Sequence, residues 1–184
     1  LGAPYYLDTT EIAKLSAYYA VYAHSEPFLE VMVRALFGDA AATGASPVSV
    51  PGAGYDLARR LDPDPAQAVA LELVGRDAGA AVGEGDDLVV RTTVVRDANG
   101  RPVPDGTRVT FQRYDQAEDV FLPDVDGGTT DGRATATVRA DRGGELVITA
   151  AFENGLRSEA LVVPIDAGGL GGMLLPDVAL PDTL

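Results

Sequence analysis

Short apolar segments rich in Val, Thr, Ile and Phe recur in this chain, and glycine, proline, aspartate and asparagine separate them. The segments cover residues 87–97, 107–114, 130–140, 145–152 and 160–165. Short strands at this spacing, with turn formers between them, predict an all-β sandwich. The turn Asp97-Ala98-Asn99-Gly100 fits a tight reversal, because Asn and Gly tolerate positive φ.

An earlier segment predicts the first strand of the same sandwich. Residues 68–75 place apolar Val69, Leu71 and Leu73 at alternate positions, as expected for a half-buried strand. The small, Gly-rich stretch 77–85 suits a strand switch or a bulge. The predicted core takes one inward position or more from each strand. Its members are Val69, Leu71, Val90, Val109, Phe111, Val138, Ile148 and Val162.

Three motifs of this region stand in an order known from one family. They are Asp97-Ala98-Asn99-Gly100-Arg101-Pro102-Val103, Thr130-Asp131-Gly132-Arg133-Ala134 and Gly144-Glu145-Leu146-Val147-Ile148-Thr149-Ala150. Residues 66–166 therefore resemble the bacterial immunoglobulin-like domains of the invasin and intimin type. The resemblance implies a spacer or adhesive module, and it assigns no catalytic residue.

The first part of the chain carries helix signals instead. Asp8-Thr9-Thr10-Glu11 has the form of a capping box and predicts a brief helix through Leu15. Ser25-Glu26-Pro27 predicts the start of a second helix over 26–37, which should stop at Gly38. Between the two, the compact segment 17–22 favours a buried strand over a helix. The second helix has a broad apolar face that needs a partner; it contains Phe28, Leu29, Val33, Met32, Leu36 and Phe37.

The same region contains several short segments in a characteristic order: Pro4-Tyr5-Tyr6-Leu7, the Tyr-rich run 17–22, Ala35-Leu36-Phe37-Gly38, Gly44, Pro47-Val48-Ser49-Val50-Pro51 and Gly54-Tyr55-Asp56-Leu57. On these segments, it resembles the end of the α/β domain of family-three glycoside hydrolases, in the β-N-acetylhexosaminidase and β-glucosidase branch. Thr43 and Ser46 stand where the family has Pro and Leu. The family's chemistry belongs to an upstream barrel, and no residue here matches its nucleophile or its acid/base loop.

Together these features predict a mainly β chain: an immunoglobulin-like β-sandwich preceded by a small α/β remnant of a larger domain. The remnant covers residues 1–57. It is followed by a stiff, extended, Pro-punctuated linker over 58–65, the sandwich over 66–166 and a flexible tail over 167–184. The chain opens on Leu1 without a signal-peptide pattern, so we expect a piece of a longer protein.

Composition narrows the possible partners. Asp and Glu number 28 against 14 Lys and Arg, a net charge of -14, which disfavours nucleic acid and anionic membranes. There is no cysteine, so disulfides and cysteine metal sites are excluded. No apolar run reaches the ~18 residues of a membrane span.

Several polar groups are candidate sites, and each has a simpler interpretation. His24, the single histidine, is followed by Ser25 and Glu26, but three adjacent residues cannot form a catalytic triad, and Ser25 suits a helix cap. Calcium could bind Asp124 and Asp126, or Asp62 and Asp64, although neither pair has the spacing of a calcium loop.

The remaining candidates are also interpreted as structural. Glu84, Asp86 and Asp87 are expected to be solvated loop carboxylates. The glycine runs 83–85 and 168–172 lack the strand-to-helix context of a phosphate loop. Five tyrosines could form a sugar-stacking platform, but packing inside a parent domain is favoured; they are Tyr5, Tyr6, Tyr18, Tyr19 and Tyr22. We therefore assign no catalytic, metal or cofactor-binding residue.

The sequence thus predicts the non-catalytic C-terminal portion of a secreted or surface glycoside hydrolase, acting on β-N-acetylhexosaminides or β-glucosides. Its expected partners are the upstream catalytic domain and polysaccharide or cell-wall glycans. Two alternatives remain open at this stage: a bacterial surface adhesin or structural module, and a glycan-binding accessory domain.

Overall fold

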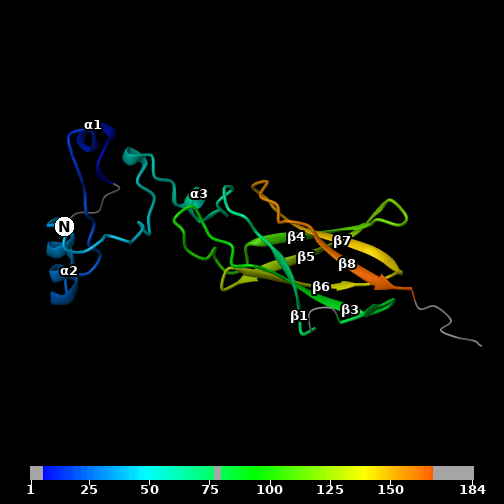
Figure 1. The fold of residues 1–184 in the computed structure, drawn as a ribbon. Helices are drawn as coiled ribbons and strands as arrows, with labels where there is room; N and C mark the ends of the chain where they lie inside the picture. The colour runs from blue at the N-terminus through cyan, green and yellow to red at the C-terminus, as the bar shows by residue number, and fades with distance from the viewer. Residues whose placement is uncertain (1–5, 77–79, 168–184) are drawn as a thin grey trace, which may run out of the picture. The chain divides into compact units, whose positions relative to one another are not determined.

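The computed structural model describes residues 6–76 and 80–167, and it divides into two compact units (Figure 1). The N-terminal unit comprises residues up to Asp64 together with Arg96–Val103, and the remaining residues form the second unit. The chain is mainly β, as predicted. Its elements are α1 (Thr9–Ile12), α2 (Glu26–Leu36), the 3-10 helix η2 (Pro51–Ala53), α3 (Leu57–Leu61), β1 (Leu71–Val74), β2 (Val82–Gly83), β3 (Asp87–Thr92), β4 (Arg108–Asp115), β5 (Val120–Thr130), β6 (Arg133–Arg139), β7 (Gly144–Phe152) and β8 (Leu161–Asp166).

The helices of the N-terminal unit begin where their capping residues predict. Asp8 and Glu11 form the reciprocal capping box of α1, with the Glu11 amide donating to Asp8 Oδ1 at 2.8 Å and the Asp8 amide donating to Glu11 Oε2 at 3.1 Å. The helix ends at Ile12, short of the predicted Leu15. Helix α2 covers nearly the predicted range, and Gly38 follows it at φ 82°. Ser25 is its N-cap by position, but its side chain makes no capping bond.

Two predictions for this unit are wrong. Residues 17–22 form no strand, and Tyr18, Tyr19 and Tyr22 are exposed, because a strand needs a hydrogen-bonded neighbour and none of the described residues pairs with this run. Residues 58–61 are also not extended, since they belong to α3, which Asp56 caps by accepting from the Ala58 amide at 3.0 Å.

The turn at 96–103 is built around the buried carboxylate of Asp97. Asp97 Oδ1 accepts the amide hydrogens of Asn99 and Arg101, each at 2.9 Å. The Asp97 amide donates to the Arg101 carbonyl at 2.7 Å, and Gly100 takes φ 77°. The predicted tight reversal is confirmed, and the Asp at its start is explained by the two donors that it satisfies.

The second unit is a sheet that curls into two layers, with strand order β1-β3-β6-β5-β4-β7-β8-β2 (Figure 1). The seven strands other than β2, lettered A to G in chain order, give A-B-E-D followed by C-F-G, which is the arrangement of the immunoglobulin fold. β5 joins the two halves, since it pairs along β4 and, at Gly128–Thr130, with β6. β1 pairs with β3, whereas β2 pairs in parallel with β8. The switch predicted near 77–85 is therefore confirmed; residues 77–79 lie outside the described ones.

Strand β5 was not predicted. Its sequence contains Pro123 and adjacent Gly127 and Gly128, which are depleted in strands. A register shift between Phe111 and Arg113 of β4 places Pro123 where the regular ladder is interrupted, so the missing amide of Pro123 breaks no regular pair. The β5–β6 turn is Asp131-Gly132, with φ 51° and 72°, the positive pair that a type I′ hairpin requires.

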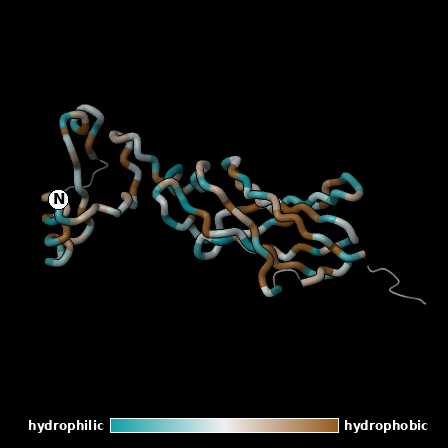
Figure 2. Tube along the Cα trace, in the orientation of Figure 1, coloured by the Kyte–Doolittle hydropathy of each residue, from teal (hydrophilic) through white to brown (hydrophobic). Residues whose placement is uncertain are grey.

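Inward side chains from both layers form one core, and Figure 2 shows the apolar residues along these strands. Six of the predicted core residues are buried: Val69, Val90, Val109, Phe111, Val138 and Ile148. Leu71 is half-buried. Val162 is 50% exposed, and Val163 takes the inward position instead. The prediction failed because Val162 and Val163 are both apolar, so alternation alone does not fix which one points inward.

Candidate functional site

The outer face of β4, β5 and β7 carries the polar and aromatic side chains that could meet a ligand. Along β4 the inward positions Val109, Phe111, Arg113 and Asp115 are buried, and the intervening positions are at least partly exposed. The outward side chains therefore come from Arg108, Thr110, Gln112 and Tyr114.

Strand register arranges these outward residues in rows across the face. Thr110 lies between Asp126 of β5 and Ala151 of β7. Gln112 lies opposite Thr149. One row is apolar: Tyr114 pairs with Phe121 on one side and with Val147 on the other, and Val147 pairs with Val162 of β8. Tyr114 and Phe121 are in tilted ring contact, with centroids 5.1 Å apart.

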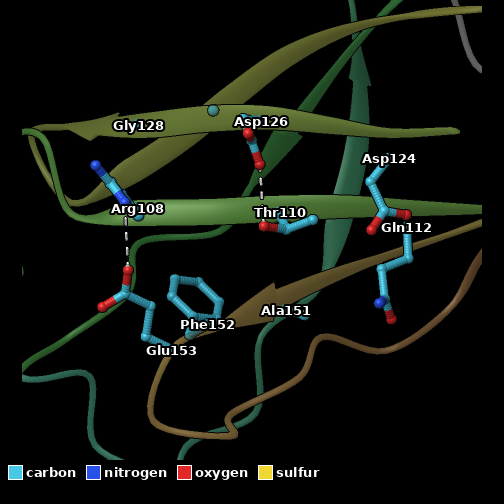
Figure 3. A pocket seen from close by; sticks show the side chains of 10 residues that line it. Arg108, Thr110, Gln112, Asp124, Asp126, Gly128, Ala151, Phe152 and Glu153 are labelled. Carbon is cyan, nitrogen blue, oxygen red and sulfur yellow. Dashed lines mark hydrogen bonds and ion pairs between the residues drawn. The ribbon is translucent and has the colours of Figure 1, made fainter.

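Beside the apolar row, the face contains a hollow of about 830 Å³. Small residues line part of it, namely Gly127, Gly128 and Ala151. Arg108 and Glu153 lie toward one end, with Arg108 Nη1 4.0 Å from Glu153 Oε1, and Gln112 and Asp124 lie toward the other (Figure 3). Gly128 and Ala151 add little side-chain volume on this face, whereas Arg108, Gln112 and Glu153 around them carry long side chains.

Internal contacts hold several polar groups of the hollow in place. The Thr110 hydroxyl donates to Asp126 Oδ1 at 3.1 Å (Figure 3). The Arg157 guanidinium donates to Gln112 Oε1. The first bond joins β4 to β5, and the second joins β4 to the segment between β7 and β8, so the side chains of Thr110 and Gln112 are oriented before any ligand arrives.

The buried guanidinium of Arg113 supports the shape of β5 behind this face. Its Nε donates to the Pro123 carbonyl at 2.9 Å, and its Nη1 donates to the Arg139 carbonyl and to Asp141 Oδ2, each at 3.3 Å. The side chain is 9% exposed, so these bonds compensate the burial of a charge. Sequence reasoning missed Arg113; the one available signal was its inward phase with Val109 and Phe111.

Two groups on this unit have shifted pKa values. The Asp119 carboxylate accepts a hydrogen bond from the Tyr114 hydroxyl, which raises the pKa of Tyr114. The Gly83 amide and the Arg76 guanidinium both donate to Asp86 Oδ2, at 3.0 and 2.8 Å, and they lower the pKa of Asp86. The Asp86 bonds tie the β2 turn to Arg76, which is a structural arrangement.

The sequence-derived candidates do not converge on one site. His24 is exposed and precedes α2, and Pro63 of the Asp62–Asp64 stretch pairs with the Asp97 turn. Asp124 and Asp126 belong to a strand and not to a loop. Tyr6 is 79% exposed, and the other described tyrosines of the N-terminal set, Tyr18, Tyr19 and Tyr22, are also exposed. None of these four side chains packs in an interior of the described residues. Tyr5 and the run 168–172 lie outside the described residues.

The described part of the chain contains neither a grouped set of metal ligands nor a membrane-spanning helix. Within residues 6–76 and 80–167, no three His, Cys, Asp or Glu side chains are grouped so that they could hold a metal ion. No helix in that part of the chain is long and apolar enough to cross a membrane.

The fold and this face define an immunoglobulin-type β-domain with a polar hollow on one sheet. No family model and no curated protein matches the chain. Among solved structures, it is similar to a polysaccharide lyase, with 10% identity and a TM-score of 0.35 over 54% of this chain and 12% of that one. It is similar to trypsin-activated alpha-2-macroglobulin from Escherichia coli, with 17% identity and a TM-score of 0.42 over 60% of this chain and 7% of that one.

A third similarity is to the PKD domain of the human VPS10 domain-containing receptor SorCS2. It has 17% identity and a TM-score of 0.31, covering 60% of this chain and 79% of that one. The matched segment is thus a small part of the lyase and of the macroglobulin. At these identities and scores, the similarities identify no family.

Proposed function

We propose that this chain is the non-catalytic C-terminal portion of a secreted or cell-surface glycoside hydrolase, and that its sandwich is an in-line spacer. The upstream catalytic domain would be its covalent partner, and glycans would be the material on which the whole enzyme acts. The resemblance of residues 1–57 to the family-three hydrolases motivates the class of enzyme. The course of the chain through the sandwich supports the spacer role.

That course runs from one end of the sandwich to the other. Near the start of the second unit, the Val69 carbonyl accepts from the Glu159 amide at 2.7 Å, so the incoming chain lies beside the residues that lead into β8. The last described strand of this unit, β8, ends at Asp166. Six strand residues rise about 20 Å, so the segment at Val69 and the end of β8 are separated by about the length of that strand. A domain crossed in this way holds its neighbours apart.

The first experiment tests the absence of catalysis. Purified chain should not hydrolyse nitrophenyl β-N-acetylglucosaminide or nitrophenyl β-glucoside above the buffer rate, because the carboxylates of the family's mechanism belong to the upstream barrel. Turnover that disappears on substitution of a residue in this chain would refute the proposal.

The second experiment tests the in-line arrangement. Because the chain has no cysteine, pairs of spin labels can be placed without background at Ala68→Cys with Ala167→Cys, and at Ala68→Cys with Ala160→Cys as the matched control. The control pair should be close, and the test pair should give one narrow distance that is longer by on the order of 20 Å. Equal distances, or a broad distribution for the test pair, would exclude a rigid in-line spacer.

A further inference from the structure

The outer face of β4, β5 and β7 combines an exposed aromatic ring with a polar hollow. The ring of Phe121 is 75% exposed, although burial of such a side chain would be worth about 1.5–3 kcal/mol. It stands in the row Phe121, Tyr114, Val147 and Val162, next to the polar hollow at Gln112 and Thr110. A flat apolar ring beside hydrogen-bonding groups matches a ligand with both kinds of surface.

The hollow offers donors and acceptors together. Arg108 and Gln112 supply N–H groups, and Asp124, Asp126 and Glu153 supply carboxylate oxygens. The amide oxygen of Gln112 already accepts a hydrogen bond from Arg157. The amide nitrogen of Gln112 is therefore the group that can donate to a ligand. A sugar hydroxyl donates one hydrogen bond and accepts others, so neighbouring hydroxyls on one ring fit this mixed lining better than an apolar peptide would.

Charge and length narrow the ligand further. The net charge of -14 opposes the approach of an anionic polymer, and a lining that holds both donors and acceptors matches the hydroxyls of an uncharged sugar. Thr110 and Tyr114 are four positions apart on β4, about 14 Å along a strand. The polar hollow and the aromatic row together therefore extend farther than a monosaccharide needs.

We propose that this face binds a neutral oligosaccharide, with Phe121 stacking against a sugar ring and Gln112 and Asp126 bonding its hydroxyls. The binding site lies on the immunoglobulin-like domain itself, not on the tyrosines of the N-terminal unit. It goes beyond the spacer role, because a domain can separate its neighbours without binding glycan.

The test is a titration of the ¹⁵N-labelled full chain with chitotetraose and, separately, cellotetraose, followed by amide chemical shifts. At least one sugar should shift the amides of Gln112, Phe121 and Ala151 in a saturable manner. The amide of Thr137, which lies on the outer face of β6, should not move. The absence of shifts with both sugars at millimolar concentration, or shifts confined to other residues, would overturn the proposal.

Variants locate the contact. Phe121→Ala and Gln112→Ala should each weaken binding by at least about tenfold, while the control Thr137→Ala on the opposite layer should bind like the parent chain. Phe121 is exposed, so its loss leaves the core intact, and the amide spectrum reports this directly. Unchanged affinity in both test variants would refute the site.

Binding of an oligogalacturonate at the same amides would refute the restriction to neutral sugars. Neither outcome alters the spin-label distance, so failure here is distinguishable from failure of the spacer proposal.

Discussion

The sandwich and the N-terminal unit differ in what covers their apolar side chains. In the sandwich, each inward position meets an opposing layer, and Val90, Phe111 and Ile148 are 0% exposed. In the N-terminal unit, α2 has no buried residue, although Phe28, Leu29, Met32 and Leu36 stand at helical spacing. Phe28 is 56% and Leu36 61% exposed.

The two units differ in whether their secondary structure is stabilised by local or by long-range hydrogen bonds. α2 is specified locally, by Pro27 in its first turn and Gly38 after its end. Helical hydrogen bonds lie within the segment, so the helix can be defined without a packing partner, but an isolated helix this short is only marginally stable in water. The strands have no such local bonds and exist only because neighbouring strands pair with them. We expect the two units to differ correspondingly in stability.

The largest expected effect is in hydrogen exchange. The amides of residues 146–150 should open only with the whole sandwich, at about 5 kcal/mol or more, whereas those of 28–36 should open locally at little cost. The backbone amides of Phe111 and Phe28 make a matched pair, because both belong to phenylalanines. Their hydrogen-exchange protection factors should differ by about 10³-fold or more. Equal protection would break the comparison and favour a self-sufficient N-terminal domain, as the adhesin interpretation requires.

Two Phe→Ala substitutions, one buried and one exposed, sharpen the comparison in terms of unfolding free energy. Phe111→Ala should lower the free energy of unfolding of the sandwich by about 3–5 kcal/mol, the usual range for a buried aromatic. Phe28→Ala, at an exposed position, should change it by less than about 0.5 kcal/mol. Urea titration followed by circular dichroism measures both. A loss below about 1 kcal/mol for Phe111→Ala would contradict its place in the core.

The next effect concerns the polar part of the core. Arg113→Met removes the donors of the Pro123 and Arg139 carbonyls and should lower the free energy of unfolding by about 1–3 kcal/mol. Arg139→Met is the control, since Arg139 is 61% exposed and its nearest carboxylate oxygens are 3.7 and 3.9 Å away; its effect should stay within about 1 kcal/mol. If the two variants were equally stable, the bonds of Arg113 would add nothing to the fold.

The smallest effect is a pH dependence at the β2 turn. The pKa of Asp86 lies below its ordinary value of 3.8 because the Gly83 amide and Arg76 bind the charged form. The unfolded chain therefore binds this proton first, and the stabilisation is present above pH 3.8 and is lost as pH falls through the folded pKa. The melting temperature of Asp86→Asn should be below that of the parent at pH 6 and should converge with it on acidification. Asp87, whose side chain is 65% exposed, provides the control. The difference in melting temperature between Asp87→Asn and the parent should change less with pH.

Local chemistry in the sequence was sufficient for several features. The capping box at Asp8, the extent of α2 and the turn at Asp97 each depend on residues within a few positions of one another. The alternation of apolar residues also placed most of the core, including Val109 and Phe111 on β4. Such features can be predicted from the sequence because the bonds that form them join residues close together in the chain.

The features that the sequence did not settle depend on partners far along the chain. β5 forms, despite Pro123 and two glycines, because β4 and β6 offer it hydrogen-bonding edges. The orientation of Val162 follows from its pairing with Val147, since an apolar run alone fits either face. Residues 17–22 have the composition of a strand but no edge to pair with in the described chain.

The candidate site shows the same division. Alternation along β4 could place Thr110, Gln112 and Tyr114 on one face, but it could not bring Phe121 and Asp126 beside them. The bulge between Phe111 and Arg113 sets that neighbourhood, and the guanidinium of Arg113 holds the β5 carbonyl there. Pairing across strands decided the site, because the free energy of each strand depends on the edge of its neighbour and not on its own residues alone.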